Sequence, residues 1–514
     1  MKPSRFPGSL PALLILLCLL PSGIAAQDNG IVEKLYENAV QLLRNGKTEE
    51  ALKGFQQIYD RYGSTSQAPD ALYQAASYHY PVLDLNDLGI ATREQIQKAL
   101  PLLDRIRTRY SSSPRAPEAL HKLGLLALEP DNPRASPNEA YAAFTSVATV
   151  YPNSPLAGGA LYGAAISQMR SGAYDVALED FSRLLEQVPG FEGVPGARLA
   201  FGYAQYRAGD FPRAMEEYQK VRELFPRRSE SLLALERLTL LHRLRLLPAT
   251  GRAVSYSQDT SYPGRLDNLG LRSVSALGLG PDGSLLVADG KQGQAVTVDP
   301  RGHPIGKFPF SGAQSAAIDR RGGLLVAGAG NILMGGKQQS LTRSDASSTR
   351  PVRETPGLAV DRDGRIYVVD GKSGELLVYG RTLDFRSSVF RSAGGGLGDV
   401  KVGFDNQVYL LDSRDKSITV LAEGKTRARI LLSDPPASIV QPVDFAVDEL
   451  GDLYVCDAGT GKVVILDPTG KSILATLGGD RGKGGIAAPE KIEVDRQGRI
   501  YVYDRKADAI LRFR

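Results

Sequence analysis

The chain has 514 residues, 62 of them Lys or Arg and 57 Asp or Glu, with a formal net charge of +5 at pH 7. This length exceeds one domain of ordinary size and suits two ordered units of about 200 to 250 residues each. The chain lacks the basic excess that binding to a phosphate backbone needs, so its composition argues against a nucleic-acid partner.

Residues 1–26 have the pattern of a secretory signal peptide. Lys2 and Arg5 precede an apolar run over residues 13–20, and small residues follow before residue 27. The run is too short to span a membrane, so we expect an exported protein, periplasmic or secreted, without a transmembrane segment in the mature chain. Cys18 lies inside the apolar run rather than after a small residue, so we do not expect a lipoprotein.

Residues 27–250 show a helical period and a repeat. In three units a glycine is followed five residues later by alanine and nine residues later by an aromatic residue: Gly46, Ala51 and Phe55; Gly172, Ala177 and Phe181; Gly209, Ala214 and Tyr218. Two further units lack the glycine but keep the spacing: Ala99, Leu103 and Tyr110; Ala140, Phe144 and Tyr151. The spacing predicts five helix pairs and a capping helix over residues 228–246. Three second helices should end before a proline, at Tyr151, Val188 and Phe225.

The segment from Phe201 to Ala214 resembles the tetratricopeptide repeat almost position for position. It reads Phe-Gly-Tyr-Ala-Gln-Tyr-Arg-Ala-Gly-Asp-Phe-Pro-Arg-Ala. We expect the small Gly202 and Ala214 to let two helices approach closely, with Phe201 and Tyr218 filling the space between them. The resemblance extends to exported bacterial tetratricopeptide proteins of the cell envelope. It implies an all-α TPR solenoid that binds protein partners there.

The resemblance assigns the concave groove of such a solenoid to positions on the first helix of each pair. Here these positions carry Tyr36, Tyr162 and Tyr203, beside apolar residues. The lysine and asparagine that clamp a peptide carboxylate in chaperone-binding relatives are missing. An apolar groove with tyrosines instead suits an amphipathic helix or an extended apolar segment of a protein partner. The alternative is that the groove packs on the second half of the same chain.

Three arginines, Arg44, Arg170 and Arg207, each stand two residues before the turn glycine of a repeat. Equal positions in successive repeats would place them in a ladder along one edge of the solenoid. Acidic residues of a protein partner could dock on this ladder. The alternative is a solvated helix end, where cations interact favourably with the negative end of the helix dipole.

Six copies of a short pattern fill residues 251–514, each with an apolar strand, a turn, a second strand and a closing residue. The closing residues are Asp289, Gly328, Asp370, Asp412, Asp457 and Asp504. Six positions earlier stand residues that tolerate the positive φ of a tight turn: Gly283, Gly322, Gly364, Asn406, Gly451 and Gly498. Three positions earlier stand large residues: Leu286, Leu325, Tyr367, Tyr409, Tyr454 and Tyr501. A period of about 40 to 50 residues with several short strands predicts an all-β six-bladed propeller.

These copies resemble NHL repeats, a short-motif class of six-bladed propellers, from residue 271 to residue 514. Blade two is the poorest copy, with Gly328 at its closing position and a polar stretch over residues 340–350 that we expect to be mobile. Blade six should take its outermost strand from residues 252–256, because closing the ring removes open sheet edges. The predicted organisation is a signal peptide (1–26), a TPR helical domain (27–250) and a propeller (251–514).

The sequence shows no catalytic constellation. Enzymes among six-bladed propellers gather metal ligands or a catalytic histidine near the central channel, but this propeller has one histidine, His303, in a loop between strands. His79, His121 and His242 lie in different repeats, where we expect packing or surface roles. Cys456 has no partner in the mature chain and is expected to be buried. We therefore predict no catalytic residue, no metal ligand and no cofactor.

The closing aspartates allow two interpretations. They could surround the channel and hold a cation, or each could cap a turn by accepting backbone N–H bonds. Their fixed place in successive units favours turn capping, because a binding site is special to one place rather than repeated.

The leading hypothesis is a non-enzymatic, exported adaptor or scaffold whose solenoid and propeller each hold a protein partner in the cell envelope. The alternative is a propeller that binds or hydrolyses a glycan, a lactone or another small molecule. A third possibility is an envelope structural protein that acts through homo-oligomers, because the sequence does not fix the oligomeric state. The identity of the partner and the propeller face that it uses are also left open.

Overall fold

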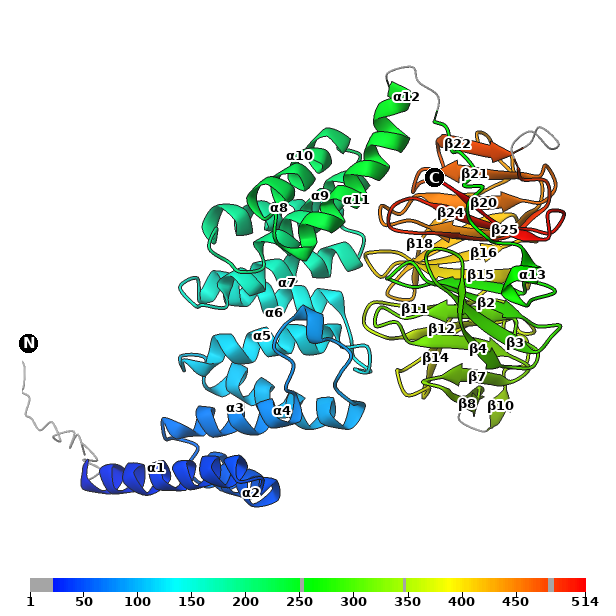
Figure 1. The fold of residues 1–514 in the computed structure, drawn as a ribbon. Coiled ribbons are helices and arrows are strands. Elements are labelled where there is room, and N and C mark those ends of the chain that lie inside the picture. The colour runs from blue at the N-terminus through cyan, green and yellow to red at the C-terminus, as the bar shows by residue number, and fades with distance from the viewer. Residues whose placement is uncertain (1–21, 250–253, 345–347, 479–484) are drawn as a thin grey trace, which may run out of the picture. The chain divides into compact units, whose positions relative to one another are not determined.

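The computed structural model describes residues 22–249, 254–344, 348–478 and 485–514 (Figure 1). The predicted signal peptide therefore lies outside the described residues as far as residue 21. The chain divides into two compact units: residues up to Tyr80 together with Lys98–Ala119, and Pro81–Gln97 together with Leu120–Arg514. The domain boundary at residue 250 stays a prediction. In the described part of the chain, no helix is both long and apolar enough to cross a membrane.

Helices follow one another in the predicted order of five pairs and a cap. The first unit contains α1 (Ser22–Arg44), α2 (Thr48–Arg61) and α3 (Gln67–His79), while α4 (Arg93–Arg109) and α5 (Arg115–Leu128) contribute residues to both units. The second unit adds η1 (Leu85–Asp87), α6 (Pro137–Val150), α7 (Ala157–Arg170), α8 (Tyr174–Gln187), α9 (Val194–Arg207), α10 (Phe211–Leu224), α11 (Ser229–Leu241), η2 (His242–Leu246) and α12 (Leu247–Ala249). The expected helix ends Tyr151, Val188 and Phe225 are the C-terminal caps of α6, α8 and α10.

The pair α9–α10 shows why the repeat sequence folds in this way. The carboxylate of Asp210 accepts the backbone N–H of Arg213 at 3.2 Å and caps the start of α10. The helix ends before Phe225, because the proline that follows disfavours helical geometry in that residue. Gly202 in α9 faces the ring of Tyr218 so closely that a Cβ there would lie 2.6 Å from it. The expected close approach of the two helices is confirmed.

In the described part of the chain, six antiparallel sheets of three or four strands correspond to the six predicted blades, and a separate two-stranded sheet accompanies blade two. Blade one has β1 (Ala276–Leu279), β2 (Leu285–Asp289), β3 (Gln294–Val298) and β4 (Pro304–Pro309); blade two has β5 (Ser315–Ile318), β6 (Leu324–Gly328), β7 (Asn331–Met334) and β8 (Lys337–Ser340). Blade three has β11 (Leu358–Val360), β12 (Ile366–Asp370), β13 (Glu375–Tyr379) and β14 (Phe385–Arg391); blade four has β15 (Leu397–Val402), β16 (Val408–Asp412), β17 (Ser417–Ala422) and β18 (Lys425–Leu431). Blade five has β19 (Pro442–Val447), β20 (Leu453–Asp457), β21 (Lys462–Leu466) and β22 (Ile473–Gly478); blade six has β23 (Pro489–Val494), β24 (Ile500–Asp504) and β25 (Ala509–Phe513).

The predicted pattern is confirmed in every blade. Each closing residue is the last residue of its second strand. The residue six positions earlier has a φ between 62° and 92°, a range that favours glycine and asparagine. The large residue three positions earlier is buried in all six blades, with at most 6% of its surface exposed. Turn chemistry and strand burial therefore both repeat with the blade.

The ring closes through its innermost and its outermost strands. First strands of neighbouring blades contact one another in a cycle, β1–β5–β11–β15–β19–β23–β1. At the outer edge of blade six, Gln258 pairs antiparallel with Phe513, and Ser257 and Arg514 exchange backbone N–H···O bonds of 3.0 Å. Among the described residues the pairing begins at Ser257, so residues 254–256 do not form the expected strand, while residues 252 and 253 of that expected strand lie outside the described residues. A short helix, α13 (Leu266–Leu269), follows.

Asp259 explains where the closing segment pairs. Its carboxylate accepts the hydroxyl of Ser261 and the guanidinium of Arg512 in β25, both at 2.6 Å. These hydrogen bonds lower the pKa of Asp259 to about 2. The length and alternation of the upstream segment do not reveal this side-chain anchor.

Blade two differs from the others beyond its fourth strand. The chain there forms a two-stranded hairpin of β9 (Thr342–Ser344) and β10 (Thr349–Pro351). Residues 345–347, at the centre of the stretch expected to be mobile, lie outside the described residues.

Candidate functional site

Helices and propeller of the second unit meet at the turns that join the first and second strands of the blades. In blades three to six these turns are residues 361–365, 403–407, 448–452 and 495–499, which we call the turn face. Side chains from α7, α9 and the segment α11–η2 reach it. Because both repeat architectures meet there, the turn face is the candidate functional site.

Arg170, the last residue of α7, pairs with Asp363 in the turn of blade three. Its two terminal nitrogens donate to the two carboxylate oxygens at 2.6 and 2.9 Å, a bidentate geometry stronger than a single hydrogen bond. Both side chains are buried, with 8% and 4% of their surface exposed. The side-chain amide of Asn406 donates to the same carboxylate at 3.0 Å. Loss of either charged partner would leave the other buried and uncompensated.

Arg207, the last residue of α9, occupies the same position one repeat later. Its Nη1 lies 3.1 Å from Oδ2 of Asp405 in the turn of blade four. The hydroxyls of Tyr203 and Tyr174 donate to the same oxygen at 3.0 and 2.5 Å. Burial raises the pKa of both tyrosines well above the usual value, so the hydroxyls remain protonated donors.

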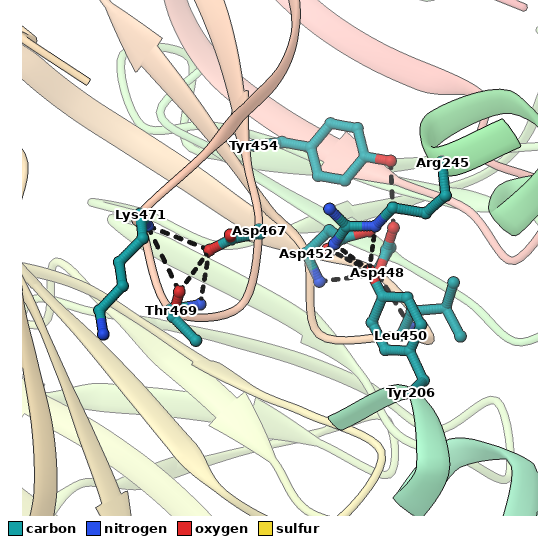
Figure 2. Close-up of polar contacts among 9 residues, drawn as sticks. All are labelled: Tyr206, Arg245, Asp448, Leu450, Asp452, Tyr454, Asp467, Thr469 and Lys471. Atoms are coloured by element: carbon teal, nitrogen blue, oxygen red, sulfur yellow. Dashed lines mark hydrogen bonds and ion pairs between the residues drawn. The ribbon is translucent and has the colours of Figure 1, made fainter. Parts of the chain in front are cut away.

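Arg245 in η2 makes the third contact, with Asp452 in the turn of blade five (Figure 2). Its Nη2 lies 3.0 Å from Oδ1 of the carboxylate, and the hydroxyl of Tyr206 in α9 donates to the same oxygen at 2.7 Å. The neighbouring Asp448 instead holds the turn itself, by accepting the backbone N–H of Leu450 at 2.8 Å. Burial, partly offset by Arg245, raises the pKa of Asp452 to about 6.

We call Arg170, Arg207 and Arg245 the arginine ladder, because each reaches an aspartate in the next blade along. Two of the three arginines predicted to form a ladder thus belong to it, and the acids that they meet are the propeller's own. The sequence left open the alternative that the groove packs on the second half of the chain. Tyr203 agrees with this alternative, because its hydroxyl donates to Asp405 in the turn of blade four. In blade six, Arg243 donates to the carbonyl oxygen of Gly498 at 3.2 Å.

Among the described residues of the second unit, Tyr162 makes no hydrogen bond with the turn face. Tyr162 in α7 is half-buried between the rings of Phe181 and Phe191, at centroid distances of 6.4 and 6.2 Å. Tyr36 and Arg44 belong to α1 in the first unit, where Tyr36 is half-buried and Arg44 is exposed. A role for these residues in binding a partner stays a prediction.

A pocket of about 490 Å³ lies at the turn-face end of the central channel. All six blades contribute to its wall, and α11 adds Leu232, Leu233 and Glu236. One turn residue from each blade surrounds the opening, and we call this set the mouth ring: Pro281, Arg320, Arg362, Phe404, Glu449 and Arg496.

The two halves of the channel wall differ in chemistry. At one register position of the first strands, blades one to three carry Gly278, Ala317 and Ala359, and blades four to six carry Lys401, Ala446 and Glu493. Small residues therefore leave space on one side, while charged side chains stand on the other.

Lys401 and Glu493 of the wall belong to a cluster of five charged side chains, whose other members, Asp399, Asp444 and Lys491, do not line the pocket. Lys401 lies 2.7 Å from Glu493 and 3.3 Å from Asp399, and Lys491 lies 3.6 Å from Asp444. Burial, opposed by Lys401 and reinforced by Asp444, raises the pKa of Asp399 to about 7. This cluster was not predicted from the sequence. The signal available was charge at strand positions where the first three blades have glycine, alanine or serine.

The closing aspartates cap turns, which is the interpretation that their fixed place in successive blades favoured. Asp289 accepts backbone N–H groups from residues 272, 273, 291 and 292 at 2.8 to 3.1 Å, and Asp457 accepts those of residues 440, 441 and 459. His303 is exposed in the turn between β3 and β4, with its Nδ1 3.6 Å from the carboxylate of Asp299. Cys456 is buried in β20, as expected, and burial raises the pKa of its thiol.

Known proteins resemble parts of this chain. No curated protein matches it. One similar solved structure is streptogramin B lyase, with 12% sequence identity and a TM-score of 0.36, where the match covers 51% of this chain and 96% of that chain. Another is virginiamycin B lyase from Staphylococcus aureus, with 13% identity, a TM-score of 0.36 and coverage of 49% of this chain and 82% of that chain. A third is an auxiliary nutrient binding protein from Bacteroides ovatus, with 14% identity, a TM-score of 0.38 and coverage of 49% of this chain and 70% of that chain. Similarity at this level does not bear on activity. Residues 197–227, which include most of the pair α9–α10, match the tetratricopeptide repeat family, and this confirms the resemblance seen over residues 201–214.

Proposed function

We propose that this chain is a non-enzymatic, exported adaptor of the cell envelope, which holds protein partners on its tetratricopeptide helices and on its NHL-like propeller. Both architectures provide broad surfaces for docking. The observation that carries the proposal is the arginine ladder. Three arginines of α7, α9 and η2 each pair with a buried aspartate of the turn face. Such a joint suits one rigid platform better than two independent domains.

Partner binding is assigned in this proposal to the first repeat. Arg44 is exposed at the end of α1, whereas its equivalents Arg170 and Arg207 already pair with aspartates of the propeller. Tyr36 stands on the same helix with part of its ring accessible. An apolar helix that carries an acidic residue would suit a tyrosine and an exposed arginine.

Affinity purification of the full chain from envelope extracts tests the adaptor function. The test variant is Arg44→Glu, and the matched control is Lys53→Glu, the same charge change at an exposed position of α2. We expect the wild type and Lys53→Glu to recover the same partner, and Arg44→Glu to lose it. A wild type that recovers no partner, or two variants that recover it equally, would contradict the proposal.

The channel pocket supports a second function, the binding or hydrolysis of a glycan, a lactone or another small molecule. A buried carboxyl with a pKa near neutral can take up or release a proton at physiological pH, and Asp399 is such a group. Purified wild type and Asp399→Asn would be incubated with panels of lactones and glycans. Turnover that depends on Asp399 supports this function, and turnover by neither protein counts against it.

A further inference from the structure

The mouth ring carries more positive charge than its own acid can neutralise. It has three arginines, at positions 320, 362 and 496, and one glutamate, Glu449, which leaves a formal charge of +2. Helix α11 adds Arg237 and Glu236, one charge of each sign. Glu449 is shared among three guanidiniums, at 3.3 Å from Arg237, 3.4 Å from Arg496 and 3.9 Å from Arg362.

Aspartates in the same turns do not cancel this excess, because their carboxylates are directed into the turns. Asp319 accepts the backbone N–H of Arg321 and of Gly323, both at 2.8 Å. Asp495 accepts the backbone N–H of Gln497 and of Arg499, both at 2.9 Å. Asp282 and Asp448 likewise accept backbone N–H groups of their own turns, and Glu493 pairs with Lys401. The acids that remain for the three arginines of the mouth ring are Glu449, which is shared, and Glu236 of α11.

Arg320 and Arg362 are the two cations least satisfied by the protein. Arg320 is exposed and lines the pocket, and it makes no hydrogen bond or ion pair with any residue that the structure describes. Arg362 has a single ion pair, at 3.9 Å, and burial together with the neighbouring arginines lowers its pKa to about 10. An added anion would relieve the repulsion among these guanidiniums.

The pocket is also shaped for an organic ligand rather than for a bare ion. Its volume of about 490 Å³ lies in the range of small-molecule sites. The guanidiniums of Arg362 and Arg237 lie over the ring of Phe404, 3.9 and 4.0 Å from its centroid, which fixes their planes. Leu232 and Leu233 of α11 add apolar surface to the same wall.

We propose that the channel-mouth pocket binds a small organic anion through carboxylate or phosphate groups held by Arg320, Arg362 and Arg496. Planar guanidiniums match both groups with paired hydrogen bonds. The small residues of blades one to three leave room for the body of the ligand. This inference names the ligand class for the second function proposed above and does not depend on the adaptor function, whose test uses Arg44.

Isothermal titration calorimetry on the purified full chain tests this site, at an ionic strength of about 0.15 M to screen distant charges. The probes are citrate, fructose 1,6-bisphosphate and uncharged sucrose. We expect at least one of the two anions to bind with a stoichiometry near one, and sucrose not to bind. Binding of citrate alone would identify carboxylate as the recognised group, and binding of the bisphosphate alone would identify phosphate.

Two variants decide whether the mouth ring is responsible. Arg320→Gln removes a cation that holds no other residue in place, so the fold should survive and affinity should fall about tenfold or more. Arg321→Gln, its exposed neighbour outside the pocket wall, makes the same charge change and should bind like the wild type. The inference is overturned if neither anion binds, if Arg320→Gln binds as tightly as the wild type, or if both variants weaken binding equally.

Discussion

Gly328 shows how one residue departs from a repeat for a steric reason. A Cβ at this position would lie 1.9 Å from the carbonyl oxygen of Gly312, so the aspartate found at the closing position of the other blades has no room here. We expect Gly328→Ala to lower the free energy of unfolding by about 1 to 3 kcal/mol. Urea unfolding measures this change. The control is Gly190→Ala, where a Cβ would meet nothing within 4 Å, and an equal loss in both variants would contradict the prediction.

His121 makes stability depend on pH. Its ring is buried in α5, edge-on to Phe144 at a centroid distance of 5.4 Å, and burial, aided by Lys122, lowers its pKa to about 4. In the unfolded chain the pKa is about 6.5, so the contribution of the neutral ring is complete above that pH and is lost as the pH falls towards 4. We expect the wild type to lose more stability than His121→Gln between pH 7.5 and pH 5. Denaturant unfolding at both pH values is the measurement, and equal losses would contradict the prediction.

Residues within a repeat could be predicted, but their partners across the fold could not. The glycines with positive φ and the buried tyrosines of the blades recur at fixed spacing, so the sequence alone identifies them. Asp363, Asp405 and Asp452 stand in turns, where polar residues are expected whether or not they have a partner. Nothing in their spacing indicates that an arginine from a helix would reach each one.

At the scale of elements, the pair Arg170–Asp363 joins the end of α7 to a blade turn. Because both groups are buried, we expect Arg170→Ala and Asp363→Ala each to lower the free energy of unfolding by about 3 to 5 kcal/mol. A double-mutant cycle should show strong coupling, with the double variant little worse than either single one. Arg44→Ala changes the equivalent but exposed position of the first repeat and should have almost no effect. Additive losses would show that the two residues stabilise the fold independently.

The segment that closes the ring depends on one carboxylate. Asp259 holds Arg512 of β25 at 2.6 Å, and their backbones pair at the open edge of blade six. We expect Asp259→Ala to speed hydrogen exchange of the β25 amides, as seen by mass spectrometry. Asp267→Ala, whose side chain is 79% exposed, is the control and should leave exchange unchanged. Because the pKa of Asp259 is lowered to about 2, its contribution is present above pH 4 and is lost as the pH falls towards 2.

Strands and helices that repeat with a regular period could be predicted from the sequence. For the closure of the ring, the sequence predicted that an upstream segment completes blade six, but not which residues pair. Open sheet edges are unfavourable, so some upstream segment had to complete blade six. The segment chosen from its alternating residues ended one residue too early, because the true anchor is a single acid that bonds to the last strand. Periodic burial thus identifies the strands themselves, whereas a single side-chain bond decides where an unrepeated segment pairs.

For the whole molecule, the arginine ladder predicts cooperative unfolding of the second unit. Three ion pairs, each with a buried aspartate, link α7, α9 and η2 to successive blades, so helices and propeller should unfold in one transition. We expect a triple variant with Arg170, Arg207 and Arg245 all changed to alanine to unfold its helices before its propeller. Calorimetry would then record two transitions in place of one.

The matched control for this variant replaces three exposed helix-end arginines, Arg44, Arg61 and Arg109, by alanine. It removes the same total charge and should keep the wild-type profile. A single transition in both triple variants would show that other contacts, such as those of Leu244 and Leu450 in shared apolar clusters, couple the two parts.

The ladder relates two different repeat lengths. Its arginines are separated by 37 and 38 residues, and the aspartates that they meet by 42 and 47. Each step of one helical hairpin along the array therefore corresponds to a step of one blade around the propeller. Insertion of a complete hairpin between α8 and α9 would move Arg207 and Arg245 away from the blades whose aspartates they contact. Additional hairpins before residue 81 would leave these contacts unchanged, together with those that Gly89 and Asp131 make with Arg381 and Arg386 of blade three, so that end of the array is where evolution or engineering can vary its length.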